Sequence, residues 1–106
     1  MRRVMLREIA HSRAGDKGDI CNVSVIPYEE KYYELLKEQL TEEVVTDFFK
    51  DLCFGKVTRY EFKGIKSLNF VMENALDGGN TRSLRVDGYG KSFSSYMLAM
   101  YVNLPD

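Results

Sequence analysis

The sequence predicts a single α+β domain over residues 1–106, in which a largely antiparallel sheet carries helices on one face. Three observations support this two-layer sandwich. Several short segments alternate apolar and polar residues, as half-buried strands do, and turn-forming residues separate them. Two further regions repeat apolar residues at helical spacing. Finally, a chain of 106 residues that is 44% hydrophobic can bury one core.

The chain opens with two predicted strands around a charged segment. Residues 4–10 alternate apolar and mixed side chains, which predicts the first strand. The second covers residues 20–26 and stops at Pro27, because proline cannot donate the next ladder hydrogen bond. Residues 11–22 combine two glycines with charges of both signs, and a simple connection would be shorter. We therefore expect a functional loop there.

Helical periodicity follows between residues 28 and 55. Thr41 suits a helix N-cap, the acidic residues after it suit the positive end of a helix dipole, and Gly55 is a predicted C-terminal cap. The region is therefore either a helical hairpin or one helix broken at Thr41. We expect two apolar stripes to enter the core: Tyr32, Leu35, Leu36 and Leu40, then Val44, Val45, Phe48, Phe49 and Leu52.

Strand patterns return in the second half of the chain. Residues 57–62 and 81–86 are predicted strands, and residues 68–75 favour a strand although their composition also suits a helix. The last apolar residues, from Phe93 to Leu104, recur at helical spacing and predict a final amphipathic helix.

The predicted order is strand, strand, helical region, three strands and helix. Short connections favour antiparallel neighbours with helices on one face, and a ferredoxin-like sandwich is the simplest such arrangement. That arrangement ordinarily ends in a strand, and only residues 102–104 are left to supply one.

Composition and charge exclude several classes of protein. The 15 basic and 16 acidic residues give a net charge of −1, which argues against a dedicated nucleic-acid or membrane-surface protein. The first residues lack the apolar core of a signal peptide, and no apolar run has the length of a membrane span. We therefore expect a cytoplasmic protein in which Cys21 and Cys53 are reduced thiols.

Familiar catalytic patterns do not fit the charged segment. Its run Gly-Asp-Lys-Gly departs from the phosphate-loop pattern, and two aspartates would repel a phosphate. His11 and Ser12 are neighbours on a strand and point to opposite faces, so they do not converge with Asp16 as a catalytic triad. One histidine with scattered carboxylates does not make a metal site, and we expect neither metal nor cofactor.

Arg82 lies in a predicted strand on the face that also carries apolar residues. A half-buried guanidinium needs an anionic partner, and Asp16 and Asp19 are acids that packing does not explain. Alternatively, Arg82 lies at the mouth of the strand in water.

Two glycine-containing segments are expected to meet in space. We hypothesise that residues 13–19 and 78–83 form one polar site, because glycines allow backbones to approach closely. The amides of Asn22 and Asn69, each between apolar neighbours on a strand, would orient the charged groups.

Four blocks of the chain carry a family resemblance. They are residues 11–19 with Asn22, residues 68–71, residues 78–85 and residues 90–91. In this order they resemble the AtuA-like ferredoxin-fold domain, the small domain of the acyclic terpene utilisation family, over nearly the whole chain. Ala14 stands where the family commonly has serine, and Asn80 where it often has a third glycine.

The resemblance implies a ferredoxin-like fold, a bacterial cytoplasm and a setting in acyclic terpene or related acyl-CoA breakdown, without an established reaction. In the family, the domain occurs alone or fused behind a larger AtuA-type domain. Two functions stay open. The chain is either a small subunit or accessory domain whose loops close over an AtuA-type partner or its acyl substrate, or a self-contained enzyme or organic-acid-binding protein. In the second case Arg13, Lys17 and Arg82 grip a carboxylate and Asp16 is the acid/base catalyst.

Association with another chain is also expected. An exposed edge strand, many tyrosines and a small core suggest a homo-oligomer or a complex with a larger AtuA-type subunit. A small organic acid or an acyl-CoA is the expected small-molecule partner. The candidate binding residues are Arg13, Asp16, Lys17, Asp19, Asn22, Asn69, Arg82 and Ser83.

Overall fold

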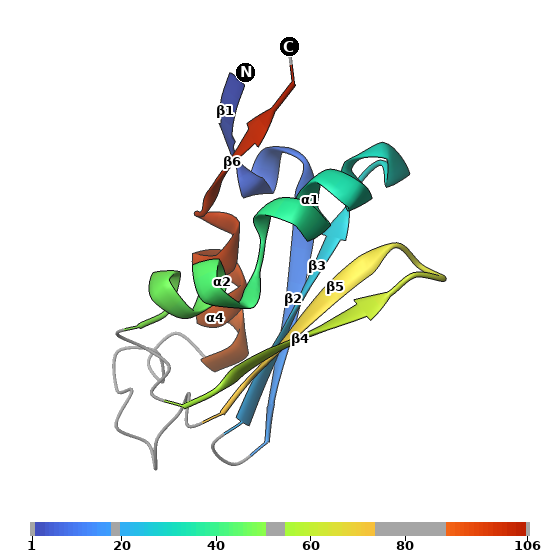
Figure 1. The fold of residues 1–106 in the computed structure, drawn as a ribbon. Coiled ribbons are helices and arrows are strands. Elements are labelled where there is room, and N and C mark those ends of the chain that lie inside the picture. The colour runs from blue at the N-terminus through green and yellow to red at the C-terminus, as the bar shows by residue number, and fades with distance from the viewer. Residues whose placement is uncertain (1, 18–19, 51–54, 74–88, 106) are drawn as a thin grey trace.

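The computed structural model describes residues 2–17, 20–50, 55–73 and 89–105, with the backbone alone at residues 16–17 and 89–92. Strands β1 and β6 form a small antiparallel sheet, and a larger antiparallel sheet has the order β2-β3-β5-β4 (Figure 1). The elements are β1 Arg2–Met5, a 3-10 helix Leu6–Glu8, β2 Ala10–Lys17, β3 Ile20–Pro27, a 3-10 helix Glu30–Tyr32, α1 Tyr33–Gln39, α2 Glu42–Phe48, β4 Val57–Phe62, β5 Ser67–Met72, α4 Tyr89–Leu98 and β6 Tyr101–Leu104.

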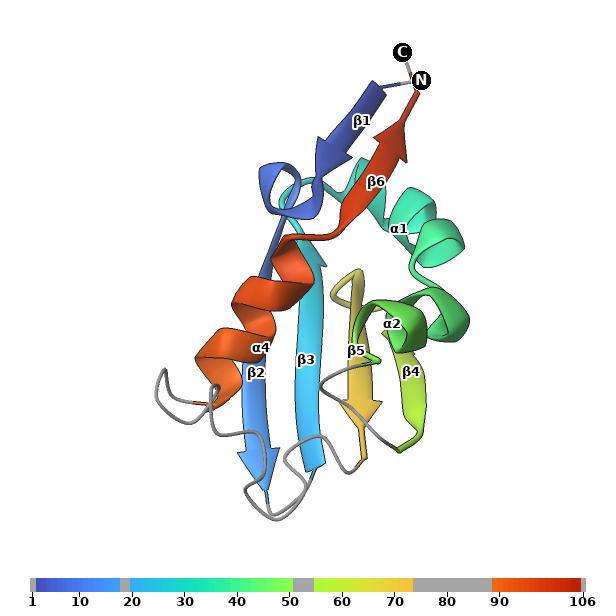
Figure 2. The same cartoon turned by 90° about the vertical axis from the view of Figure 1, so that its left-hand side faces the viewer.

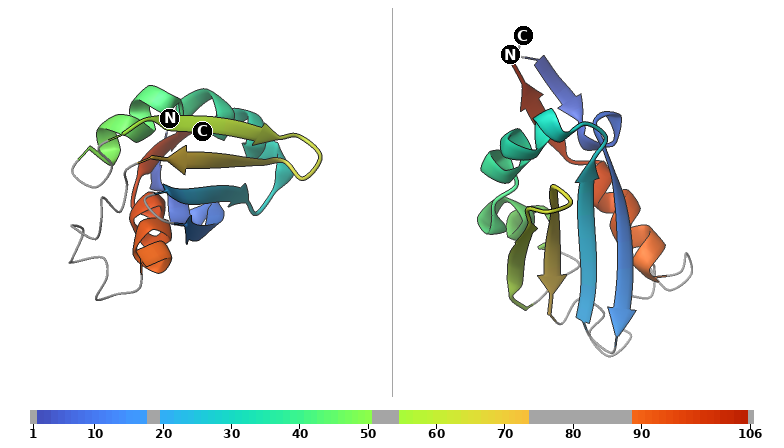
Figure 3. Two further views of the ribbon diagram at one scale, coloured as in Figure 1. Left: turned by 90° about the horizontal axis from the view of Figure 1, so that it is seen from below. Right: turned by 90° about the vertical axis from the view of Figure 1, so that its right-hand side faces the viewer.

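The helices lie on one side of the larger sheet. Figure 2 looks onto α2 and α4 in front of the strands, and the right panel of Figure 3 looks onto the opposite face, where the strands are in front. This arrangement confirms the predicted α+β two-layer sandwich, with an antiparallel sheet and helices on one face. Among the described elements, no helix covers the second face of the sheet (Figure 3).

The core fills the space between the sheet and the helices. Alternate residues of β3 and β5 point inward, as period-two strands require, and meet apolar stripes from the helices. The fully buried side chains from these elements include Cys21, Val23, Val25, Leu36, Val45, Phe49, Phe70, Met72, Phe93 and Met97. Aromatic packing joins α2 to α4, because the Phe49 ring centroid lies 5.7 Å from that of Phe93 and 5.0 Å from that of Tyr96.

The helical region is a pair of short helices, one of the two arrangements left open by the sequence. Thr41 caps α2 as predicted, because its Oγ1 accepts a hydrogen bond from the Val44 backbone N–H at 3.1 Å. Gly55 was expected as the C-terminal cap, and this is wrong, since α2 ends at Phe48. Val44, expected in the core, is 44% exposed.

The single strand predicted over residues 4–10 is wrong. A 3-10 turn separates β1 from β2, because Leu6 is fully buried and its backbone N–H donates to the Met100 carbonyl at 2.7 Å. The Glu8 carboxylate also accepts a hydrogen bond from the Met5 backbone N–H at 3.1 Å. Side-chain burial and these two hydrogen bonds therefore turn the chain where alternation alone predicts continuity.

The final helix predicted to reach Leu104 is too long. Helix α4 ends at Leu98, and the N–H groups of Ala99 and Met100 close a last turn on the Tyr96 and Met97 carbonyls. Residues Tyr101–Leu104 then pair with β1 and supply the closing strand that the sequence left in question. The strands predicted over residues 57–62 and 68–75 are confirmed as Val57–Phe62 and Ser67–Met72, whereas residues 81–86 lie outside the described residues.

Candidate functional site

The charged segment of residues 11–22 is mostly strand, so the predicted loop conformation is wrong, while a functional role of the segment stays a prediction. Strands β2 and β3 pair in unbroken register from Ala10 opposite Pro27 to Lys17 opposite Ile20. Gly15 lies opposite Asn22, and a Cβ atom at Gly15 would lie 3.7 Å from the Asn22 side-chain amide. Because Gly15 has no side chain to crowd Asn22, strands β2 and β3 pair almost to the tip of their hairpin.

Two cross-strand rows of four residues each lie on the side of the larger sheet that faces away from the helices. We call these eight residues the open face. The first row is Arg13, Ser24, Asn69 and Tyr60, and the second is Gly15, Asn22, Val71 and Thr58, each residue paired with the next. Their inward neighbours on β3 and β5 are buried, so alternation places these rows on the side away from the helices.

Three of the predicted site residues come together on the open face. Arg13 lies in one row with Asn69, and Asn22 lies in the other row, diagonal to Asn69 across β3 and β5. Ser24 holds the Arg13 backbone, since its Oγ accepts from the Arg13 N–H and donates to the Arg13 carbonyl, each at 3.2 Å. This face can therefore offer one guanidinium and two amides to a ligand or a partner.

Of the other predicted site residues, two are described by their backbone alone and three lie outside the described residues. The backbone of Asp16 pairs with Cys21, and that of Lys17 with Ile20, near the hairpin tip. Asp19, Arg82 and Ser83 lie outside the described residues, and so does residue Cys53. The meeting of residues 13–19 with residues 78–83, and the role of Asp16, stay predictions.

His11 and Ser12 point to opposite sides of β2, as the sequence indicated. The His11 side chain is exposed, and its ring stacks on that of Tyr28 with centroids 5.4 Å apart. Ser12 Oγ is buried. A catalytic triad built on these two neighbours is therefore excluded by geometry.

Two exposed aromatic residues of β4 were not predicted as functional. Tyr60, in the first row, is 50% exposed, and Phe62, two residues further along β4, is 48% exposed. The sequence shows them as one face of a strand, and the available signal was their alternation with two charged residues, Arg59 and Glu61. The structure turns the charged residues inward, because Arg59 Nη1 donates to the Lys37 and Leu40 carbonyls at 2.6 and 2.9 Å.

The outer edge of β4 is covered by a side chain. The Glu42 carboxylate accepts a hydrogen bond from the Arg59 backbone N–H at 2.7 Å, which is the donor that points away from β5. Nearby, Glu61 Oε2 lies 3.3 Å from Arg59 Nη2.

The pKa of Lys37, in α1, is raised above its usual value. The cause is the Glu34 carboxylate, which is hydrogen-bonded to Lys37 and lies 3.2 Å from its Nζ.

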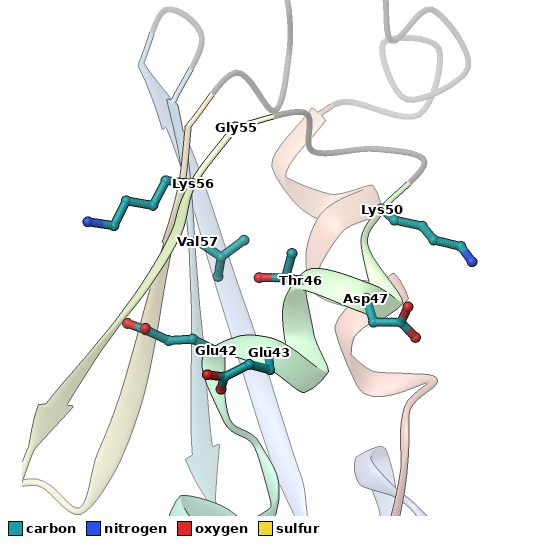
Figure 4. Close-up of a pocket in the computed structure, with 8 residues that line it drawn as sticks. All are labelled: Glu42, Glu43, Thr46, Asp47, Lys50, Gly55, Lys56 and Val57. Carbon is teal, nitrogen blue, oxygen red and sulfur yellow. The ribbon is translucent and has the colours of Figure 1, made fainter.

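A groove of about 580 Å³ opens between α2 and the start of β4 (Figure 4). Thr46 and Val57 point toward each other across it, whereas Lys50 and Lys56 point away (Figure 4). It is lined by Glu42, Glu43, Thr46, Asp47, Lys50, Gly55, Lys56 and Val57. None of these residues belongs to the predicted site, and the groove lies on the helix side of β4.

Within residues 2–17, 20–50, 55–73 and 89–105, no group of three histidine, cysteine or acidic side chains is placed to hold a metal ion. No helix in the same ranges is long and apolar enough to cross a membrane.

The comparison with protein families gives one match. The model described as the AtuA ferredoxin-like domain matches residues 4–103, nearly the whole chain. The chain belongs to this family. Membership confirms the resemblance carried by the sequence blocks and agrees with the ferredoxin-like α+β sandwich seen in the structure. No curated protein and no solved structure matched the chain.

Proposed function

We propose that this AtuA ferredoxin-like domain is the small subunit or accessory domain of a larger AtuA-type enzyme, acting in acyclic terpene or related acyl-CoA catabolism. The family match over residues 4–103 supports the partner class. The observation that carries the proposal is the position of Arg13, Asn22 and Asn69 on an open sheet face, where a second protein can reach all three. In this role the domain contributes polar groups to a site that its partner completes.

The open face suits this role because an uncovered, solvated sheet face does not by itself exclude water from a reaction. Acid–base chemistry and electrostatic stabilisation gain strength when water is removed. A larger subunit that covers Arg13 and the two amides would supply that exclusion. The substrate then lies between the two proteins, and Asp16 near the hairpin tip stays the candidate acid/base catalyst.

A second candidate is a self-contained enzyme or organic-acid-binding protein that holds a carboxylate with Arg13, Lys17 and Arg82. One observation favours it. Among the side chains that the structure describes, no carboxylate pairs with Arg13, whose side chain is exposed, and this supports a role for Arg13 in binding an organic anion.

Co-purification at native abundance, followed by light scattering, separates the two candidates. The accessory-domain proposal expects a complex that contains a larger AtuA-type chain. A homo-oligomer alone, carrying an organic acid identified by mass spectrometry, would favour the second candidate. A 12.3 kDa monomer without either companion would contradict both the proposed complex and the expected homo-oligomer.

A further inference from the structure

We propose that a pocket between the small β1–β6 sheet and the α1 region binds a small aliphatic acid, and that Arg2 holds its carboxylate. The pocket shares no residue with the open face, and the inference goes beyond the proposed function without resting on it. It is carried by the cavity itself, by an arginine on the apolar side of a strand, and by the charge balance of the lining.

The pocket has a volume of about 220 Å³. Its walls come from β1, β6, α1 and the 3-10 helix Glu30–Tyr32, and Figure 2 shows β6 beside both β1 and α1. Pockets that hold drug-sized ligands start at about 300 Å³, so this one suits a shorter molecule. The lining residues are Arg2, Lys31, Tyr32, Leu35, Leu104 and Pro105.

The apolar part of the lining rests on the hydrophobic core. Leu104 belongs to the core and is only 3% exposed, whereas Tyr32 and Leu35 are partly exposed and pack against it. These walls are therefore in place before a ligand enters, which lowers the entropic cost of binding. An aliphatic chain that leaves water for such walls gains free energy in proportion to the apolar area that it buries.

Arg2 lies on the apolar side of the small sheet. Strand alternation places it on the same side as Val4, and the antiparallel register sets these two residues opposite Leu104 and Val102. Those three neighbours are buried, whereas Arg3, the next residue, lies on the other side of β1. A guanidinium beside apolar walls attracts an anion more strongly than one surrounded by water, because the walls reduce dielectric screening.

The charges around the pocket favour a single negative charge on the ligand. Lys31 Nζ already lies 3.6 Å from a Glu29 carboxylate oxygen, and it lies 5.2 Å from the ring centroid of Tyr32. Among the side chains that the structure describes, no carboxylate pairs with Arg2 and none lines the pocket. A carboxylate matches the fork of a guanidinium, so one cation beside apolar walls favours an aliphatic monocarboxylate over a phosphate.

Titration of the purified chain with hexanoate tests the proposal. The methyl NMR signals of Leu35 and Leu104 should shift saturably, with a dissociation constant of about 1 mM or lower. The methyl signals of Leu68, which is buried in the larger sheet, should not shift. Acetate, which lacks the aliphatic tail, should bind at least about tenfold more weakly. Hexylamine has the tail and the opposite charge, and we expect no measurable binding.

Variants separate the contributions of the two cations. Arg2→Gln should weaken hexanoate binding by at least about fivefold, because a charge-assisted hydrogen bond is lost. Arg3→Gln is the matched control and should bind within about twofold of the unmodified chain. Glu29→Gln should strengthen binding by about twofold or more, because it frees Lys31 for the ligand, and Glu30→Gln should have a smaller effect. Thermal unfolding of each variant shows whether the fold is intact.

Several outcomes would overturn the proposal, and none of them affects the accessory role. They are the lack of a saturable shift, equal binding of hexylamine, and unchanged affinity in a folded Arg2→Gln variant. Asp106, which lies outside the described residues, follows Pro105 in the sequence. If hexanoate binds only after Asp106→Asn, the chain's own carboxylate fills the pocket and the proposed ligand is wrong. The ligand is also wrong if hexanoate dissociates a homo-oligomer, because the pocket then belongs to an interface between copies.

Discussion

Gln39 and Asn103 are joined by two hydrogen bonds. The Gln39 side-chain Nε2 donates to the Asn103 carbonyl at 2.7 Å, and the Asn103 backbone N–H donates to Gln39 Oε1 at 2.8 Å. A side-chain amide at the end of α1 therefore takes the place of a neighbouring strand along β6. It fastens the small β1–β6 sheet to the helical layer and satisfies a backbone edge that would otherwise face water.

Replacing Gln39 tests the strength of this attachment. Gln39→Ala removes both bonds and should lower the free energy of unfolding by about 1–2 kcal/mol, since each bond contributes about 1 kcal/mol net. Urea unfolding measures the change. Glu38→Ala, at an exposed neighbouring position on α1, is the control and should be close to neutral. Equal stabilities for the two variants would contradict the attachment.

Arg59 is expected to be more important for stability than a surface arginine. Its side chain is 18% exposed, its Nη1 donates to two carbonyls at the end of α1, and its Nη2 lies 3.3 Å from Glu61 Oε2. The single ammonium nitrogen of lysine cannot occupy both of these nitrogen positions. Arg59→Lys should destabilise the fold by about 2 kcal/mol. The same change at the exposed Arg3 should cost little, and thermal or urea unfolding of both variants makes the comparison. A neutral Arg59→Lys would show that the carbonyls find other donors.

Glu42 is expected to keep β4 from pairing with other chains. Glu42→Ala uncovers the outward N–H of Arg59, so the variant should self-associate more than the unmodified chain at equal concentration. Glu42→Gln retains an acceptor oxygen and should stay closer to the original behaviour. Light scattering over a concentration series measures this, with Glu43→Ala as the control for loss of charge. Identical association of the two alanine variants would rule out the edge as the cause.

Strand β4 shows why part of the fold escaped sequence reasoning. Alternation located the strand but does not reveal which side faces the core, because aromatic residues such as Tyr60 and Phe62 normally point to a core, whereas here both are exposed. The reversal comes from the end of α1, whose carbonyls need a donor that only the folded chain brings near. By contrast, Thr41 acts locally, so its role as a cap was readable from the sequence alone.

The predictions for the β2–β3 hairpin and for strand β6 were wrong for a related reason. Residues 11–17 look like a loop because glycine and charges disfavour strands on average, yet pairing with β3 overrides that preference. Tyr101–Leu104 continues a helical pattern of apolar residues by coincidence, and its partner β1 is remote in sequence.

For the candidate site, Arg13, Asn22 and Asn69 could each be predicted from the sequence as single residues. Only the cross-strand register places them on one face.

One prediction made from the sequence concerns residues beyond the described ranges. If Arg82 is half-buried beside Asp16 or Asp19, Arg82→Met should destabilise the fold by roughly 3 kcal/mol, because a carboxylate is left without its partner. Adding Asp16→Asn or Asp19→Asn should then recover part of the loss. A double-mutant cycle by urea unfolding measures the coupling. Strict additivity with both aspartates would contradict the predicted polar cluster.

The pairing of β1 with β6 imposes an order on folding. Its register joins Arg2 to Leu104 and Val4 to Val102, so β1 has no strand partner until residues 101–104 have been synthesised. Closing so long a loop costs more entropy than closing the β2–β3 hairpin, and contacts of this range form slowly. Val4, which is buried in the folded chain, therefore stays in water while the larger sheet assembles. On the ribosome, β1 therefore emerges well before the strand that pairs with it.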